Sequence, residues 1–354
     1  MHRSPVNKVL CVLLAAAAAL NLSACSPRKE KQRYSKAYLE FFDTVTQIIG
    51  YEEDEETFSQ NCEKVYSLLE EYHQLTDIYH SYEGVNNVRT INRSAGAEPV
   101  KVDEKLIGLL EFSKEMCRVT GGACNIAMGS VLSIWHKYRE AGINDPESAA
   151  LPPMEDLTEA AKHCDIDHLI IDRDAGTVFL DDPEMSLDLG AAAKGYAVER
   201  AAELLMNEGV TSGYTLNIGG NVRTIGTKAD GSDWAAGIQN PDTEDEQNPY
   251  IVRLKLNGMS LVTSGNYQRY YEVNGVRYHH IIDPVTLMPL NNFASVSILC
   301  NDSGKADALS TALFNMTIGD GKSLLANIGG IEAIWVLPDG SYECTDGFSE
   351  LIID

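Results

Sequence analysis

The stretch from residue 263 to residue 289 constrains the fold of this chain more than any other. Asn274-Gly275 supplies the two positive-φ positions that a type I′ turn requires, and residues 267–273 and 276–282 on either side alternate in polarity. This pattern predicts a two-stranded antiparallel hairpin. Periodicity alone leaves open whether the hairpin is an ordinary surface feature or part of a site.

Two histidines stand next to each other near the end of the second predicted strand. Successive side chains of a strand point to opposite faces, so one of His279 and His280 faces a core or cleft while the other faces away. Asp283-Pro284 then ends the strand, because proline has no N–H group for the ladder. Binding and catalytic residues often lie where strands end, so this end of the hairpin is a candidate site.

The rest of the chain alternates predicted strands and helices without regular β-α-β order. Apolar side chains recur at helical spacing in three segments, residues 58–72, 104–119 and 303–314. A first strand is predicted at residues 38–51 and a loop at residues 75–92. Asn-Gly turns between strands argue against an all-parallel sheet. The predicted fold class is α+β, an antiparallel, hairpin-rich sheet with packed helices in one globular unit at residues 38–354.

The N-terminal segment, residues 1–24, has the pattern of a lipoprotein signal peptide. Arg3 and Lys8 accompany an apolar stretch of about a dozen residues, too short for a membrane span of ~20 residues. Residues 22–25 read Leu-Ser-Ala-Cys, which matches a lipobox and predicts lipidation of Cys25; a plain signal peptide with an incidental cysteine is the alternative. We expect residues 25–37 to tether the protein to the extracytoplasmic face of a bacterial cell membrane.

The charge of the chain limits which ligands it can bind unaided. Lys and Arg number 28 against 52 Asp and Glu, a net charge of −24. Removing residues 1–24 takes away two basic residues, which leaves 26 against 52, or −26. Binding to a nucleic acid needs a basic face, so the composition argues against that class of partner. A polyanionic ligand such as a dinucleotide would need a divalent cation or local Lys and Arg side chains.

Two glycine-containing segments have the composition of ligand-binding turns. Thr120-Gly121-Gly122 ends a predicted helix and offers flexible backbone with free N–H groups, although a helix C-cap followed by a turn explains the same glycines. Small residues at 190–193 lead from a predicted strand into a helix and let backbone approach a ligand closely. Lys194 stands at the start of that helix, where an ammonium group and the helix dipole both favour phosphate.

A carboxylate and a hydroxyl share one face of a predicted helix near the C-terminus. Asp307 and Thr311 are four residues apart and therefore stack on the same side. Hard oxygen ligands of this kind suit Mg²⁺, which also keeps waters and substrate phosphates in its coordination shell. The same spacing is common as surface decoration, so the pair alone leaves both interpretations open.

Four separated motifs resemble those of the FAD:protein FMN transferases, the ApbE family, and occur in the family's order. They are TSGNYQRYYEVNGVRYHHIIDP at residues 263–284, TGGA at residues 120–123 followed by Leu132 and Trp135, DLGAAAKGYA at residues 188–197 and ADALSTALF at residues 306–314. The resemblance runs from about residue 38 to the C-terminus and implies an ApbE-like, T-fold-like domain. It also implies a Mg²⁺-dependent enzyme that moves FMN from FAD to a Thr or Ser of an acceptor protein through a phosphoester bond and releases AMP.

The resemblance implies roles for individual residues. Asp307, Thr311 and the backbone carbonyl of Ala191 would hold Mg²⁺. Residues matching FAD contacts of the family are spread along the chain: Phe42, Tyr79, Ala123, Cys124, Asn125, Asp188, Lys194 and Ile281. For Phe42, an ordinary core phenylalanine is the alternative. Members usually carry Asp in place of Asn125 and commonly Phe in place of Cys124, so any role that needs a carboxylate at Asn125 is in doubt.

The histidine pair supplies the predicted catalytic group. His280, near Asp283, is expected to orient or deprotonate the acceptor hydroxyl. His279 is the second candidate, and a structural histidine is the alternative for either.

The acceptor is expected to be another protein. The family's acceptor motif, Asp-x-x-Ser/Thr-Gly-Ala-Ser/Thr, does not occur in this chain. Candidate acceptors are extracytoplasmic redox subunits and flavin-bearing lipoproteins. Two alternatives to transfer stay open at this point: hydrolysis of FAD to FMN and AMP, and flavin binding by a lipoprotein without catalysis. AMP release separates storage from both reactions, and flavin bound covalently to a partner separates transfer from hydrolysis.

Overall fold

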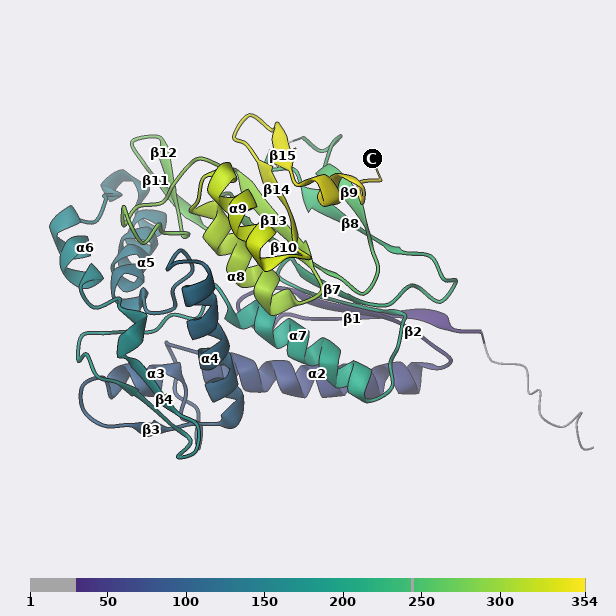
Figure 1. The fold of residues 1–354 in the computed structure, drawn as a ribbon, viewed down its shortest axis with the longest axis horizontal. Coiled ribbons are helices and arrows are strands. Elements are labelled where there is room, and N and C mark those ends of the chain that lie inside the picture. The colour runs from purple at the N-terminus through teal and green to yellow at the C-terminus, as the bar shows by residue number, and fades with distance from the viewer. Residues whose placement is uncertain (1–29, 243–244, 354) are drawn as a thin grey trace, which may run out of the picture.

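A computed structural model describes residues 30–242 and 245–353 of the chain (Figure 1). Within this part, the main sheet has 8 antiparallel strands in the order β1-β2-β6-β7-β10-β13-β14-β15. Its strands are β1 (Gln32–Tyr38), β2 (Thr46–Glu52), β6 (Tyr214–Ile218), β7 (Asn221–Ile225), β10 (Ser260–Gly265), β13 (Ser295–Cys300), β14 (Glu332–Val336) and β15 (Tyr342–Cys344). The α+β fold class predicted from the sequence is confirmed.

Smaller sheets and the helices complete the fold. The smaller sheets comprise β3 (Val100–Lys101), β4 (Leu169–Asp172) and β5 (Thr177–Leu180), then β8 (Trp234–Gln239) with β9 (Tyr250–Leu256), and β11 (Tyr270–Val273) with β12 (Val276–His279). The helices are α2 (Glu55–Thr76), α3 (Val88–Arg93), α4 (Glu104–Val119), α5 (Gly129–Asn144), α6 (Met154–Ala161), α7 (Ala193–Asn207), α8 (Ser303–Phe314), α9 (Ile318–Ile328) and α10 (Asp346–Ser349).

Side-chain caps explain where several helices begin. The Asp54 carboxylate accepts from Thr57 N at the start of α2, and the Asp302 carboxylate accepts from Lys305 N at the start of α8. Each cap satisfies one of the N–H groups that the first turn of a helix leaves without a partner. The predicted helices at 58–72, 104–119 and 303–314 are therefore confirmed, with α2 longer at both ends.

The main sheet is buried on both faces. Helices α2, α7 and α8 pack on one face, as Figure 1 shows. The β8–β9 hairpin and Phe348 of α10 form an apolar cluster with Leu261 and Leu299, which point to the other face. All six residues of β13 are buried, as expected of a central strand covered on both sides. The sheet is therefore the rigid base against which α7 and α8 are positioned.

The Asn-Gly hairpin is confirmed. Asn274 and Gly275 have φ of 52° and 75°, the sign that a type I′ turn needs, and Val273 pairs with Val276 beside them. The hairpin stands apart from the main sheet and packs on α5, where the Tyr271 ring covers Gly142. A Cβ at Gly142 would lie 2.6 Å from Cδ2 of Tyr271, so glycine permits this close packing.

In the N-terminal half of the chain, three predictions were wrong in detail and one helix was missed. Residues 38–51 are not one strand, because Phe42 and Asp43 turn the chain with φ of 52° each between β1 and β2. The predicted loop at 75–92 contains the start of α3, which Asn87 caps. Helix α5 was not predicted as an element. The predicted tether at 25–37 overlaps β1, which pairs with β2 from Gln32 onward.

Candidate functional site

The site is built where the start of α7 crosses α8. Asp307, on α8, is only 4% exposed, and its Oδ2 accepts a hydrogen bond of 2.8 Å from Gly195 N. Nζ of Lys194 lies 3.7 Å from the same oxygen. Gly195 is in the first turn of α7, where backbone N–H groups lack helical partners and the helix dipole favours a negative charge. The crossing thus fixes one carboxylate beside one ammonium group.

Gly195 allows the two helices to meet. A Cβ at this position would overlap the carbonyl oxygen of Ser303 and the Cβ of Asp307. We expect Gly195→Ala to lower the free energy of unfolding by about 1–3 kcal/mol, because α7 and α8 must separate. Urea unfolding measures this. Gly319→Ala is the control, since its nearest neighbour would lie 3.9 Å away; equal losses in both variants would contradict the packing argument.

The predicted metal ligands fit a hard cation in their chemistry. Asp307 and Thr311 stack on α8, and Ala191 packs against the apolar cluster that contains α8. A carboxylate, a hydroxyl and a backbone carbonyl are the oxygen donors that Mg²⁺ takes. Among the described residues, no group of three or more His, Cys, Asp and Glu gathers as a metal centre. A cation here would therefore have Asp307 as its carboxylate ligand, with the Thr311 hydroxyl, the Ala191 carbonyl and substrate oxygens as neutral or substrate donors.

The turn after α4 is tightly closed. The N–H groups of Gly121, Gly122 and Ala123 donate to backbone carbonyls, and Cys124 N donates to Oγ1 of Thr120. The expectation of free N–H groups was wrong, because the turn itself uses them. The Cys124 thiol is buried, and burial raises its pKa to about 12. Any ligand contact here would go through other backbone atoms.

Asn125 has a structural role in this turn. Its Nδ2 donates to the carbonyl of Cys164 at 2.8 Å, and its Oδ1 accepts from Ala127 N at 2.9 Å. The amide satisfies both ends at once, which an aspartate could not do because it has no donor. The departure from the usual Asp therefore anchors the loop before β4 in this chain.

Asp188 lies on the segment that joins this turn to α7. Asp188 N donates to the carbonyl of Ile126 at 2.8 Å, and Asn92 holds both the N–H and the carbonyl of Leu187. The Asp188 carboxylate accepts from Gly190 N at 2.9 Å and remains half-exposed. These bonds place Asp188 between the TGGA turn and Lys194.

Tyr79 and Phe42 border the same region. The Tyr79 side chain is 56% exposed, and its hydroxyl lies 3.0 Å from Nδ1 of His136 on α5. Burial and the nearby Asp188 carboxylate raise the pKa of Tyr79. Phe42 N donates to Nδ1 of His73, and the two rings meet edge to face at 5.7 Å. Phe42 is half-buried at the edge of the core, so its flavin contact stays a prediction.

The structure separates the two histidines. His279 is 2% exposed; its Nε2 donates to the carbonyl of Leu290 at 2.9 Å and its Nδ1 accepts from Ile281 N at 3.2 Å. Both ring nitrogens are therefore occupied, which makes it a structural histidine. His280 makes no side-chain hydrogen bond within the described chain, and its Nδ1 is buried. Nε2 is the ring nitrogen left to meet a ligand.

Burial and a cationic surrounding keep His280 neutral. Burial, then the charges of Arg269, His279, Arg139 and Lys194, lower the pKa of His280 from 6.5 to about 3. His280 is therefore in the neutral form that a general base needs, but its low pKa makes it a weak base until a bound anionic substrate adds negative charge that raises this pKa.

The depressed pKa predicts a pH dependence of stability. The unfolded chain protonates His280 near pH 6.5, whereas the folded protein resists protonation down to about pH 3. Between these values the unfolded state binds more protons, so stability falls as the pH falls below 6.5, by up to about 1.4 kcal/mol per pH unit. Urea unfolding between pH 4.5 and pH 7.5 should show a shallower decline for His280→Gln than for the wild type. Parallel declines would contradict the prediction.

Asp283 and Ile281 frame the end of the hairpin. Oδ2 of Asp283 accepts from Thr286 N at 2.8 Å, and its backbone bonds to Leu287 and Met288 close the turn. No hydrogen bond or ion pair within the described chain joins Asp283 to His280, so its catalytic role stays a prediction. Ile281 is 6% exposed and packs in the apolar cluster that also holds Cys124 and α8.

Comparison with known proteins decides the family. A model of the ApbE family matches residues 42–335. The chain belongs to the ApbE family. A relative from Treponema pallidum named FAD:protein FMN transferase is 31% identical, over 98% of this chain and 94% of its own length. One of the same name from Klebsiella pneumoniae is 33% identical, over 77% of this chain and 81% of its own length.

Solved structures of ApbE proteins share the fold. The ApbE protein of Thermotoga maritima superposes with a TM-score of 0.78 and 28% identity, over 91% of this chain and 100% of that one. The flavin transferase ApbE of Vibrio cholerae gives a TM-score of 0.74 and 25% identity, over 91% and 99%.

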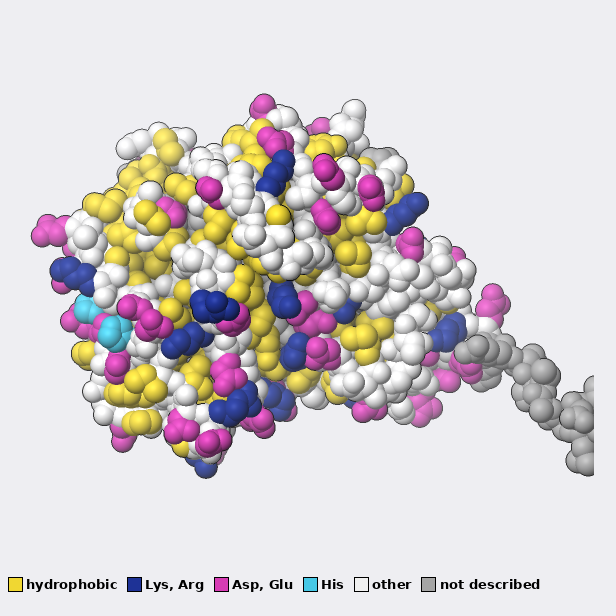
Figure 2. All heavy atoms as spheres, viewed as in Figure 1, with side chains coloured by type: hydrophobic (Ala, Val, Ile, Leu, Met, Phe, Trp, Pro, Cys, Tyr) yellow, Lys and Arg dark blue, Asp and Glu magenta, His cyan; other side chains and the backbone are white. Residues whose placement is uncertain are grey.

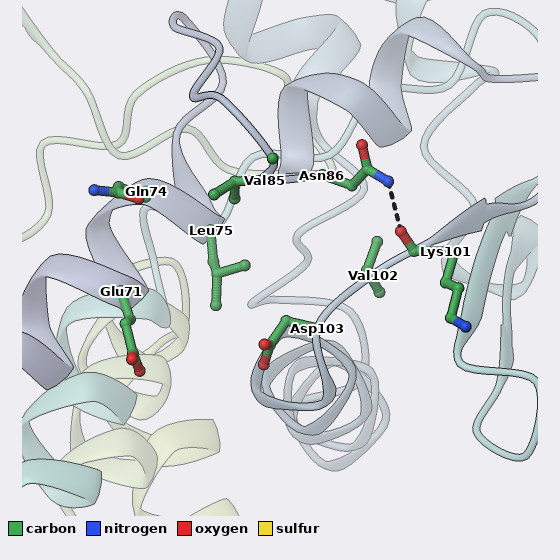
Figure 3. A pocket seen from close by; sticks show the side chains of 9 residues that line it. Glu71, Gln74, Leu75, Val85, Asn86, Lys101, Val102 and Asp103 are labelled. Atoms are coloured by element: carbon green, nitrogen blue, oxygen red, sulfur yellow. Dashed lines mark hydrogen bonds between the residues drawn. The ribbon is translucent and has the colours of Figure 1, made fainter.

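The described part of this ApbE chain has two hollows, one away from the predicted site residues and one next to them. One, of about 290 Å³, lies between the end of α2, the loop before α3 and the residues after β3; Figure 3 shows Asn86 bonded to the Lys101 carbonyl in its wall. None of the described residues predicted to bind FAD or metal lines it. The other, of about 680 Å³, includes Gly121, Gly122 and Asn125, so it touches the outer side of the TGGA turn.

Sequence reasoning missed three residues of the site. His136 and Arg139 come from α5, and Arg269 directly precedes β11. Part of the signal was available in the sequence, because His136 directly follows Trp135 of the second motif and Arg139 lies about one helical turn further on. Arg269 lies inside the hairpin motif itself but had no assigned role.

Proposed function

We propose that this protein is a Mg²⁺-dependent FAD:protein FMN transferase. The observation that carries the proposal is the contact of Lys194, Gly195 and Asp307 at the α7–α8 crossing. His280, directly after β12, adds an imidazole without a side-chain hydrogen bond in the described chain. This arrangement offers a carboxylate for a cation, an ammonium group for phosphate and a base for a hydroxyl. The names of the ApbE relatives support flavin transfer as the reaction.

The chemistry is a displacement at phosphorus. The acceptor Thr or Ser oxygen attacks the FMN phosphorus, the bond between that phosphorus and the bridging oxygen breaks, and AMP leaves with that oxygen. Nε2 of His280 takes the hydroxyl proton. Lys194 pairs with the phosphates, and the half-exposed Asp188 borders the nucleotide. Asp307, Thr311 and the Ala191 carbonyl would hold Mg²⁺, which when bound neutralises pyrophosphate charge.

The test uses the chain from Ser26 onward with FAD, Mg²⁺ and a domain that carries Asp-x-x-Ser/Thr-Gly-Ala-Ser/Thr. Intact mass of the acceptor and AMP in solution are measured together. A mass gain equal to FMN, with AMP and lost on EDTA addition, supports the proposal. AMP without the mass gain indicates hydrolysis, and bound FAD with neither product leaves flavin carriage.

We also propose that Cys25 is lipidated and holds the enzyme on the extracytoplasmic face of the membrane. Cys25 lies outside the described residues, so the support is the lipobox pattern. No helix of residues 30–242 and 245–353 is long and apolar enough to cross a bilayer. Cell fractionation should find the wild type in the membrane and Cys25→Ser outside it. Equal membrane fractions would contradict the proposal.

A further inference from the structure

Helix α5 packs against the β11–β12 hairpin (Figure 1), and His280 directly follows β12. Trp135 Nε1 donates to the Leu287 carbonyl at 3.0 Å, and Gly142 lies under the Tyr271 ring. Trp135 and Gly142 are seven residues apart, so they share one face of the helix, and Arg139 lies between them on that face. Arg139 is therefore turned toward the hairpin.

Arg269 reaches the same place from the hairpin. It directly precedes β11, and its carbonyl accepts a hydrogen bond of 3.1 Å from His280 N. The Arg269 backbone is thus tied to the residue proposed as the base. Its side chain is exposed, whereas Arg139 is half-buried.

Arg139 and Arg269 lie on two elements that pack together, and neither side chain has a bonded partner among the described residues. Burial lowers the pKa of Arg139 and the Arg269 charge adds to this, whereas Tyr79, Glu140 and Asp188 act in the opposite direction. Neither side chain makes an ion pair or hydrogen bond with another described residue. By contrast, Arg118, Arg173, Arg200 and Arg223 all pair with glutamates.

Arg139 is half-buried without an ion pair to any described residue, in a chain of net charge −24. Acidic side chains are spread over the face that Figure 2 shows, so partners for arginine are not scarce. A half-buried guanidinium group without a bonded counter-ion costs free energy unless a ligand brings negative charge. Guanidinium groups bind phosphate through paired, planar hydrogen bonds.

We propose that Arg139 and Arg269 form a clamp for a phosphate group of the flavin dinucleotide, on the α5 side of His280. The inference rests on the proposed function for the identity of the dinucleotide. The clamp would hold the phosphate near the base, separately from the oxygen donors around Asp307.

Flavin binding without metal or acceptor tests the clamp. FMN and riboflavin differ by one phosphate, so the ratio of their dissociation constants, measured by flavin fluorescence in EDTA, reports phosphate recognition. In the wild type FMN should bind about tenfold to a hundredfold more tightly than riboflavin. Arg139→Gln/Arg269→Gln should lose about tenfold or more of that ratio and keep its riboflavin affinity. Arg173→Gln, which removes a surface arginine paired with Glu111, should keep the wild-type ratio.

Other outcomes assign the pair differently. AMP and adenosine, whose affinities are measured by displacement of FMN, form the second pair of probes. If the variant loses the AMP-to-adenosine affinity ratio instead, the clamp holds the phosphate on the AMP side of FAD. If the double variant keeps both the FMN-to-riboflavin and the AMP-to-adenosine affinity ratios, the proposal is overturned. A higher KM for the acceptor would then show that the arginines recognise an acidic group of the acceptor. If the double variant does not fold, Arg269→Gln alone replaces it, because that side chain is exposed. Binding needs no turnover, so the clamp can stand even if FMN transfer fails.

Discussion

Asp307→Asn is expected to slow FMN transfer by about a hundredfold or more. Asparagine has the same shape, and its Oδ1 can still accept the hydrogen bond from Gly195 N, so the helix crossing should persist. The substitution removes the negative charge that would face a cation and that lies 3.7 Å from Lys194. The rate of acceptor mass gain, measured across a Mg²⁺ titration, should show both a lower maximum and a higher half-saturating Mg²⁺ concentration.

Asp174→Asn is the matched control for this result. Asp174 lies in the exposed turn between β4 and β5, so the same chemical change should leave the rate and the Mg²⁺ titration unaltered. If Asp307→Asn keeps the wild-type rate and Mg²⁺ requirement, Asp307 is not a metal ligand and the proposed site is wrong.

Glu199→Ala is expected to lower the free energy of unfolding by about 3–5 kcal/mol. Glu199, on α7, is 4% exposed and accepts from Nε and Nη2 of Arg223 at 2.9 and 3.1 Å. It also accepts from Ser303 N, at the start of α8, at 2.7 Å. Its removal leaves a buried guanidinium without its counter-ion and a backbone N–H without its partner. Urea unfolding followed by circular dichroism measures the loss.

The neighbouring turn of α7 offers the control. Glu203 pairs with Arg200 at 2.8 Å, but its side chain is 41% exposed, so Glu203→Ala should cost at most about 1 kcal/mol. Replacing Glu199 and Arg223 together by methionine should recover most of the lost stability, because no unpaired charge is then buried. Similar losses for the Glu199 and Glu203 variants would show that the buried pair does not hold the helices.

Glu199 also bears on the reaction. It lies one turn along α7 from Gly195, and Ser303 lies one turn before Asp307 on α8. The Glu199–Arg223 pair therefore positions α8 from β7, and Asp307 follows. We expect Glu199→Ala to weaken Mg²⁺-dependent transfer even at temperatures where the variant remains folded.

Local signals in the sequence predicted much of the fold. Asn274-Gly275 predicted the hairpin because a type I′ turn restricts both residues to positive φ. Helical spacing of apolar side chains predicted α2, α4 and α8, and the structure adds the Asp54, Asp103 and Asp302 caps at their starts. The order of strands in the main sheet is set by contacts between distant segments, such as β2 with β6, and no local pattern contains it. The turn at Phe42 and Asp43 was missed because the aromatic Phe42 favours a strand, although Asp43 is a residue type common in turns.

Individual residues of the site could be predicted where a single sequence motif contained them. Lys194 and Asp307 were predicted from separate motifs, and the structure brings them to one crossing. His280 and His279 were indistinguishable by alternation alone, because the choice depends on the Leu290 carbonyl that occupies His279. Arg139 and Arg269 are 130 residues apart, so only the packing of α5 on the hairpin relates them.

The early start of β1 restricts where this enzyme can work. The sheet begins at Gln32, seven positions after Cys25, and at ~3.5 Å per residue this stretch spans at most about 25 Å. With Cys25 lipidated as proposed, the catalytic domain cannot range far above the bilayer. Acceptors would have to present their hydroxyl within a thin layer next to the membrane, which favours proteins that are themselves anchored there over freely diffusing ones.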